Sequence, residues 1–502
     1  MAWGKDRKHV PLSDVDHRHH PSNLWNNIEG PSDFLYRLWI NRTFRKLIPG
    51  VVLFIILLAL PNPDGLSWEG QKALALFVFI VYLWITETFP LPVTAFMAGV
   101  GLLVMGVYTG DGKTVDAFAP YASDAVFMVL GSLIMAQGLV SSGGDKLLAS
   151  SLMNRFATST FGLLGGIILI SALMSAVIPG HAVAAFMLPV VYSLIIATNI
   201  KENRGETVAM IIAIAMGCEV GSLATPSGGA RNAIAIGYLQ ELPTYGQQIT
   251  YLEWVVLALP LTLILIPVAF LILLVAFKVK NRPLEVEPLP TDDSMGLRPY
   301  LGLMILVATI IMFLTLSDRL SLGTVAMIGG ILMFIFGLLR WDVARGELRW
   351  GVIFIYGAAL TMGAALTNTG AAFWLADKAI GGLGLIGIFL LLTLVVVVAS
   401  IFTNIMSDAA AVALLLPIVV PMAIIVGADD AQKTEYAFYT TMATALASGF
   451  AYITVFGTPP NTIVHASGKV TAKDFLKAGL PMWFASIVIM LVMVNTYWRW
   501  LG

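Results

Sequence analysis

Two ionisable side chains stand inside long uncharged stretches of the sequence. His181 lies near the middle of residues 156–200, which contain no Asp, Glu, Lys or Arg. Asp408 is the only charged residue within residues 379–428. A charged group at membrane depth costs about 2.5–3.5 kcal/mol on insertion scales, and such groups generally serve a function. The chemistry that these two side chains could perform is ion binding or proton transfer.

The residues beside them are typical of helix ends. Pro179 and Gly180 precede His181, and a helix that begins there exposes backbone N–H groups that favour an anion. The imidazole adds a donor that gains a charge below about pH 6.5. Ser407 and Asp408 are suited to cap the helix that follows them. His181 is therefore a packed histidine, a substrate ligand or a proton carrier, and Asp408 is a helix cap, a functional carboxylate or both.

Arg231 places a permanent positive charge in the segment "ATPSGGARNAIA", residues 224–235. A guanidinium presents a fork of donors that matches a carboxylate or a sulfonate. The same side chain could instead reach the membrane interface, or form an ion pair with Glu219, twelve residues earlier. The sequence leaves open whether Arg231 pairs with Glu219 or with an anionic substrate.

The composition indicates that membrane-spanning helices hold these side chains. Of the 502 residues 58% are hydrophobic and 12% charged, whereas about 25% are charged in soluble domains. Apolar stretches of about 20 residues, enough to cross a bilayer, recur from Ile48 onward. The single cysteine, Cys218, excludes an internal disulfide, and no phosphate-binding loop, nucleophile motif or metal-ligand cluster is found. We therefore expect an all-α polytopic membrane protein that contacts lipid and a small solute. We expect no enzymatic activity, no cofactor and no nucleic-acid partner.

The charges of the loops predict the topology. Basic loops favour the cytoplasmic side of a membrane. The basic and acidic loops fit this rule only if the two uncharged stretches are re-entrant hairpins. The pattern then predicts about eleven spans, with the N-terminus in the cytoplasm and the C-terminus outside. The predicted parts are a polar cytoplasmic tail (1–45), a first repeat (46–277), a cytoplasmic linker (278–299) and a second repeat (300–502).

The two uncharged stretches resemble each other. The segment "HAVAAFMLPVV" (181–191) aligns with "AAAVALLLPIVV" (409–420), and Pro189 then falls on Pro417, 228 positions later. With the topology above, the first hairpin enters from the cytoplasm and the second from outside. The two halves are therefore predicted to be inverted copies of each other.

A second pair of segments follows at nearly the same spacing. "ATPSGGARNAIA" (224–235) aligns with "FGTPPNTIV" (456–464), and Asn232 falls on Asn461, 229 positions later. Each half thus contains a helix that is interrupted at a Thr-Pro pair before an asparagine. Inverted repeats with broken helices are typical of secondary transporters, which bind substrate and ions at the breaks. The predicted broken helices are 207–239 and 435–465.

These motifs resemble one known family. The segments "YLWITETFPLPVTAF" (82–96) and "FMVLGSLIMAQGLVSSGGDKLLA" (127–149), the two hairpins and "FGTPPNTIV" are similar to the divalent anion/sodium symporter family. The similarity runs from about residue 48 to the end. It implies a homodimer in which each protomer has a scaffold and a transport domain that moves as an elevator. It also implies sodium-coupled transport of dicarboxylates, citrate or sulfate, and we expect a bacterial inner-membrane protein.

In that family a Ser-Asn-Thr sequence at each hairpin tip binds sodium and the substrate carboxylates. Here the first tip reads Pro179-Gly180-His181, the second Ser407-Asp408-Ala409, and the first break Gly229-Ala230-Arg231-Asn232. Only the second break, Gly457-Thr458-Pro459-Pro460-Asn461, keeps the family form. The predicted substrate-binding residues are Pro179, Gly180, His181, Thr225, Arg231, Asn232, Ser407, Asp408, Ala409, Thr458, Pro459 and Asn461. The residues predicted to act in ion coupling are Asp408, His181, Gly457 and Asn461.

The leading functional hypothesis is a secondary active transporter of a small organic anion, a carboxylate or a sulfonate. Arg231 stands where the family binds one sodium ion, and an ionised Asp408 would repel an anion, so we expect proton coupling or exchange. Sodium-coupled transport of a di- or tricarboxylate or of sulfate is the alternative, because the second break still allows one sodium ion. An inorganic ion permease or antiporter is a second alternative. Since both tips lack the usual Asn and Thr, a substrate with one acidic group, or with one acid and one amine, is favoured.

Overall fold

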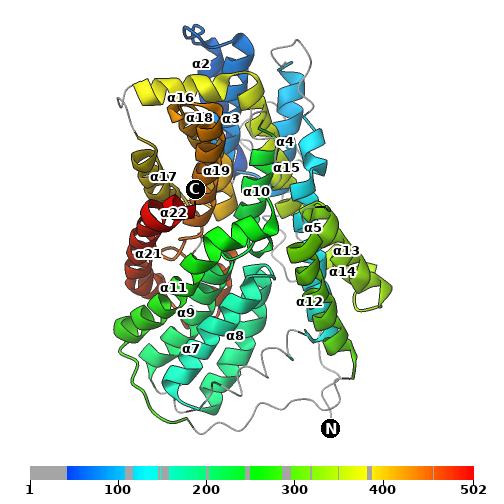
Figure 1. Cartoon of the computed structure of the whole chain (residues 1–502), viewed down its shortest axis with the longest axis vertical. Helices are drawn as coiled ribbons and strands as arrows, with labels where there is room; N and C mark the ends of the chain where they lie inside the picture. The colour runs from blue at the N-terminus through cyan, green and yellow to red at the C-terminus, as the bar shows by residue number, and fades with distance from the viewer. Residues whose placement is uncertain are drawn as a thin grey trace, which may run out of the picture.

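The computed structural model describes residues 42–501 with several gaps. Within this described part the regular elements are helices, and no strand is present (Figure 1). The predicted tail 1–45 lies outside the described residues up to residue 41, and so does the centre of the predicted linker 278–299. The residues not described within the range are 87, 108–116, 145–146, 148–155, 157, 199, 201–202, 243–248, 285–295, 317–318, 349, 382–386 and 456.

The helices follow the predicted division into two halves. In the first half they are α2 (Arg42–Ala59), α3 (Trp68–Thr86), α4 (Leu91–Val104), η4 (Ala119–Ala122), α5 (Asp124–Ser142), α7 (Thr160–Ser175), α8 (Gly180–Ala197), α9 (Arg204–Gly221), η6 (Pro226–Gly228), α10 (Ala230–Gln240) and α11 (Tyr251–Phe277). In the second half they are α12 (Arg298–Leu316), α13 (Leu322–Ile335), α14 (Trp341–Glu347), α15 (Trp350–Asn368), α16 (Ala371–Gly381), α17 (Ile388–Phe402), α18 (Asp408–Val426), α19 (Asp430–Ala447), α20 (Pro459–Ala466), α21 (Ala472–Met493), η7 (Val494–Trp498) and α22 (Arg499–Leu501).

The apolar helices are those of an integral membrane protein. Among the described residues six helices are long and apolar enough to cross a bilayer, and six more are apolar but shorter. Only 33% of the apolar window of α11 is buried, and leucines such as Leu263 and Leu271 are more than half exposed on it. Leucines on an outer surface fit contact with lipid rather than water. The count of eleven spans stays a prediction.

Each half contains a helical hairpin, formed by α7 and α8 in the first and by α17 and α18 in the second. Their tips are equivalent, because α8 begins at Gly180 and α18 at Asp408, 228 positions later. In Figure 1, α7 and α8 lie toward one end of the long axis and α18 toward the other. The second hairpin is shorter than the predicted 379–428. The left-handed Gly370 (φ 74°) ends α15 and a separate helix, α16, takes up residues 379–381.

Each half also contains an interrupted helix, α9 with α10 and α19 with α20. Both interruptions fall inside the predicted broken helices, 207–239 and 435–465. Prolines explain why neither helix runs through. Pro226 in η6 and Pro459 at the start of α20 have no N–H to give to a preceding turn.

The hairpins and the interrupted helices pack crosswise between the halves. α20 of the second half packs against α8 of the first, and α10 of the first packs against α18 of the second. The approach is close: a Cβ added to Gly180 would lie 3.2 Å from Cγ of Pro460. This exchange of partners brings both tips and both breaks to one place.

α5 and α15 close the remaining side of that place, since both contact α10. α5 is itself fixed on α13. The carboxylate of Asp124 accepts hydrogen bonds from the backbone N–H of Gly323, at 3.0 and 3.1 Å, and from the Ser321 hydroxyl. It thereby satisfies donors at the N-terminus of α13 that would otherwise lack a partner. The wall formed by α5 therefore has a defined position.

Candidate functional site

A cavity of about 210 Å³ lies where the two tips and the two breaks meet. Nine of the residues that the sequence singled out line it: Pro179, Gly180, His181, Arg231, Ser407, Asp408, Ala409, Thr458 and Pro459. Four others do not border it: Thr225, Asn232, Gly457 and Asn461. The fold thus gathers residues from four distant segments, as the repeat led us to expect.

Four helix N-termini border this cavity, those of α8, α10, α18 and α20. The N-cap residues Pro179, Gly229 and Thr458 offer no side-chain hydrogen bond to the helices that follow. Only α18 has a side-chain cap, because Ser407 Oγ accepts a hydrogen bond from the N–H of Ala410 at 3.3 Å. Uncapped N-termini present free N–H donors and the positive end of the helix dipole. The cavity is therefore a place where negative charge is stabilised.

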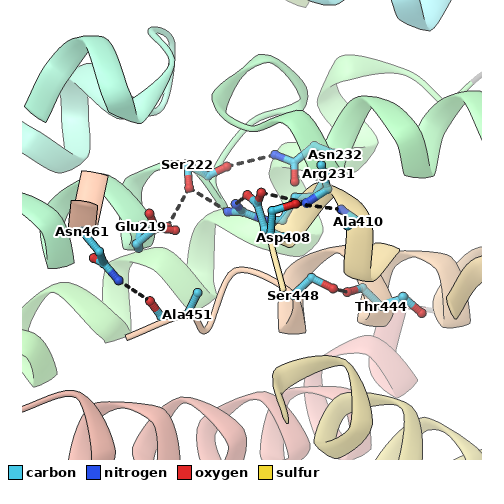
Figure 2. A network of polar contacts seen from close by, with 12 residues as sticks. Glu219, Ser222, Arg231, Asn232, Asp408, Ala410, Thr444, Ser448, Ala451 and Asn461 are labelled. Carbon is cyan, nitrogen blue, oxygen red and sulfur yellow. Dashed lines mark hydrogen bonds and ion pairs between the residues drawn. The ribbon is translucent and has the colours of Figure 1, made fainter. Parts of the chain in front are cut away.

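Arg231 is the buried cation of the site, with 1% of its side chain exposed. Its Nη1 lies 2.8 Å from Oδ2 of Asp408, and its Nη2 donates to Oγ of Ser222 at 2.7 Å (Figure 2). Ser222 in turn donates to the backbone carbonyl of Glu219 at 2.7 Å. The ion pair joins the first break to the second tip. Neither partner considered from the sequence, Glu219 or a substrate, takes this position.

Asp408 uses both of its carboxylate oxygens. Oδ2 faces Arg231, and Oδ1 accepts a hydrogen bond from the N–H of Ala409 at 2.7 Å. Asp408 is the first residue of α18, and 14% of its side chain is exposed. The carboxylate therefore serves the helix N-terminus and the guanidinium at once, which combines the capping and the functional roles expected for it.

Asn232 and Asn461 hold the two breaks in the same way. The Nδ2 of Asn232 donates to the carbonyls of Ser222 and Thr225, at 2.9 and 2.8 Å. The Nδ2 of Asn461 donates to the carbonyls at positions 451 and 454, at 2.8 and 2.9 Å, so both amides reach back ten and seven residues. These carbonyls sit where the helix ladder is interrupted and have no helical donor. The amide groups thus fix the backbone behind the cavity.

We expect Asn461→Ala to lower the thermal stability of the detergent-solubilised protein. The substitution leaves two carbonyls of the second break without their donor, and each unsatisfied buried group costs about 1–3 kcal/mol. The measurement is the unfolding temperature by intrinsic fluorescence. Asn495→Ala is the matched control, because the Nδ2 of Asn495 also donates to a carbonyl, that of Leu491, but on the exposed surface of a helix. Equal shifts for both variants would contradict the assigned role.

Several lining residues were not singled out from the sequence. Glu219, considered there only as a partner of Arg231, is 3% exposed and borders the cavity. The opposite wall comes from α5 and α15. It is made of Met128, Val129, Ser132, Leu133, Ile355 and Tyr356. Apolar residues within a span look alike whether they face lipid or a cavity, so the sequence held no signal for this wall.

Comparison with known proteins places this geometry in a family context. The model of the sodium:sulfate symporter transmembrane region matches residues 41–502. A protein of Staphylococcus saprophyticus named sodium-dependent dicarboxylate transporter SdcS is 26% identical over 484 residues, which cover 89% of this chain and 90% of that protein. A protein of Cupriavidus necator named membrane protein is 24% identical over 486 residues, 91% of this chain and 92% of that one.

The fold also matches a solved structure. The crystal structure of the Alcanivorax borkumensis YdaH transporter, described as having an unusual topology, superposes with a TM-score of 0.53 at 13% identity. The match covers 85% of this chain and 99% of that chain. The family and these relatives are membrane transporters and not enzymes. With its all-helical membrane fold and a family match over residues 41–502, the chain belongs to the sodium:sulfate symporter family, the divalent anion/sodium symporters that its motifs resemble.

Proposed function

We propose that this chain is a secondary active transporter that carries a small organic anion in the cavity between the tips and the breaks, coupled to sodium. One observation supports this function above the others: four helix N-termini and the buried Arg231 face a single cavity. Such a set of donors favours an anion. The volume of about 210 Å³ lies below the ~300–1,000 Å³ of drug-sized sites, which fits a small metabolite.

The charges of the lining favour a coupled cation. When ionised, Asp408 and Glu219 outnumber Arg231 among the lining residues. An anion would then enter a site whose side chains already carry excess negative charge, and a cation that binds with it removes the repulsion. Two observations favour sodium. Relatives of this chain are named sodium-dependent transporters, and the buried Oδ1 of Asn232 has no hydrogen-bond partner and could accept a small cation.

Transport requires that the cavity reach both sides of the membrane. We infer that the hairpins and broken helices form a transport domain that moves past a scaffold containing α5 and α15, in a homodimer of the inner membrane with a cytoplasmic N-terminus. The packing supports this division, because α8 with α20 and α10 with α18 interlock while α5 pairs with α13. The cavity then lies between the two bodies, where a sliding motion would expose it in turn.

Proton coupling is the second candidate, and Asp408 is the observation that favours it. Its carboxylate borders the cavity, is 14% exposed and faces Arg231. Protonation would remove a negative charge beside the incoming anion. His181, which also lines the cavity, is the other group that could carry the proton.

Uptake by purified protein in proteoliposomes tests the proposal. Labelled carboxylates and sulfonates are offered under an imposed inward sodium gradient or an imposed pH gradient. We expect accumulation that is driven by the sodium gradient and stops when sodium is replaced by choline. Uptake that persists without sodium and rises as the external pH falls would favour the proton candidate. If no organic anion shows counterflow, the protein moves inorganic ions instead and the proposal is wrong.

A further inference from the structure

The two hairpin tips occupy equivalent positions in the two halves but offer different donors to the cavity. The N-terminus of α8 follows Pro179, which makes no side-chain cap, so the first turn keeps its N–H groups. The N-terminus of α18 is already served by its own side chains. Ser407 accepts from the N–H of Ala410, and Asp408 accepts from the N–H of Ala409. The first tip is thus open to an acidic group, whereas the second tip is filled.

Asp408 has the contacts that a substrate carboxylate would seek in this cavity. Its two oxygens bind a helix N-terminal N–H at 2.7 Å and the guanidinium of Arg231 at 2.8 Å. A second acidic group brought by a substrate would compete for these same donors and would meet the negative charge of Asp408. Glu219, also on the cavity wall, adds to that repulsion when ionised.

The opposite wall offers nothing to a second charge. Met128, Val129, Leu133 and Ile355 present apolar side chains to the cavity from α5 and α15. The hydroxyl of Tyr356, from the same wall, is buried and has no hydrogen-bond partner among the described residues. An acidic group placed here would lose its water without gaining a cation, which is costly. An apolar body with at most one polar substituent matches this wall.

We propose that the transported anion carries one acidic group, held at the N-terminus of α8, and an apolar body that packs against α5 and α15. Asp408 is then a built-in carboxylate that takes the place of the second acidic group of a dicarboxylate. This inference rests on the proposed function, because it concerns the substrate of the same cavity. It separates this chain from relatives that are named dicarboxylate transporters.

The first test compares matched substrates in proteoliposomes that contain the wild-type protein. The n-alkanoates from propanoate to hexanoate are measured beside the dicarboxylates of equal chain length and the corresponding alkanesulfonates. We expect the substrates with one acidic group to be preferred over the matching dicarboxylates by at least about tenfold in initial rate, the order expected when a charged group lacks its partner. Preferred uptake of the dicarboxylates overturns this inference alone. Absence of uptake in every series overturns the proposed function with it.

The second test removes the built-in carboxylate. In Asp408→Ala a dicarboxylate can place its second group at Arg231 and at α18, so the preference should shift toward dicarboxylates by at least about tenfold. Succinate should also raise the unfolding temperature of this variant, and acetate, which fits the vacated place, should restore alkanoate uptake. Asp474→Ala is the control: it breaks an ion pair of 2.7 Å, to Arg204, that does not border the cavity. An unchanged preference in folded Asp408→Ala overturns the inference, and if this variant does not fold, the wild-type series decides.

Discussion

Replacing Arg231 with alanine is expected to reduce uptake to the background of empty liposomes. The guanidinium is the buried cation of the cavity, and it is held by Asp408 at 2.8 Å and by Ser222 at 2.7 Å. Its loss removes the positive charge that balances the site and leaves the carboxylate of Asp408 without its partner. Breaking one side of a buried ion pair costs about 3–5 kcal/mol. Uptake and unfolding temperature are measured on the same preparation.

Two further variants separate transport from folding. Arg231→Ala combined with Asp408→Ala removes both charges, so we expect it to recover much of the lost stability without recovering sodium-driven uptake. Arg231→Lys keeps the charge but loses the fork of donors, and we expect it to fold and to transport weakly. Wild-type uptake by Arg231→Ala would show that the cavity does not bind the anion.

Much of the framework could be predicted from local sequence. Pro189 and Pro417 fixed the equivalence of the two hairpins, and the Thr-Pro…Asn pattern located both breaks. These signals are readable because a proline or an interrupted helix at membrane depth needs special residues nearby. Asn232 and Asn461 illustrate the limit of such reasoning. The pattern showed that they belong to the breaks, but it could not tell that their amide groups bind backbone carbonyls behind the cavity.

The pairing of Arg231 could not be predicted, because its partner lies 177 residues away. A helix places residues three or four apart on one face, which makes Glu219 visible as a neighbour of the break. The approach of the second tip depends instead on the crosswise packing of α10 on α18. The same is true of Tyr356, which reaches the cavity only through the position of α15. Contacts that depend on tertiary packing leave no periodic signal in the sequence.

Gly221→Val is expected to prevent folding of the transporter, because two helix backbones touch at this residue. A Cβ added to Gly221, in α9, would lie 2.1 Å from the carbonyl oxygen and 2.4 Å from Cα of Ala172, in α7. At Gly217, one turn earlier, it would lie 2.7 Å from the carbonyl oxygen of Ile168. Two glycines four residues apart form the small-residue face on which membrane helices approach closely. The backbone of α7 cannot move aside as a flexible side chain would.

The clash reaches the functional site through the next residue. Ser222 follows Gly221 and holds Nη2 of Arg231, so separating α9 from α7 also displaces the guanidinium. Overpacking costs about 1–3 kcal/mol where side chains can adjust, and a backbone clash should exceed that range. We expect a lower yield of monodisperse protein and an unfolding temperature well below that of the wild type. Gly346→Val is the matched control, because a Cβ at Gly346, in α14, would meet no atom within 4 Å. Wild-type yield and stability for Gly221→Val would mean that α7 and α9 are not in backbone contact, and the position assigned to Arg231 would be lost with that contact.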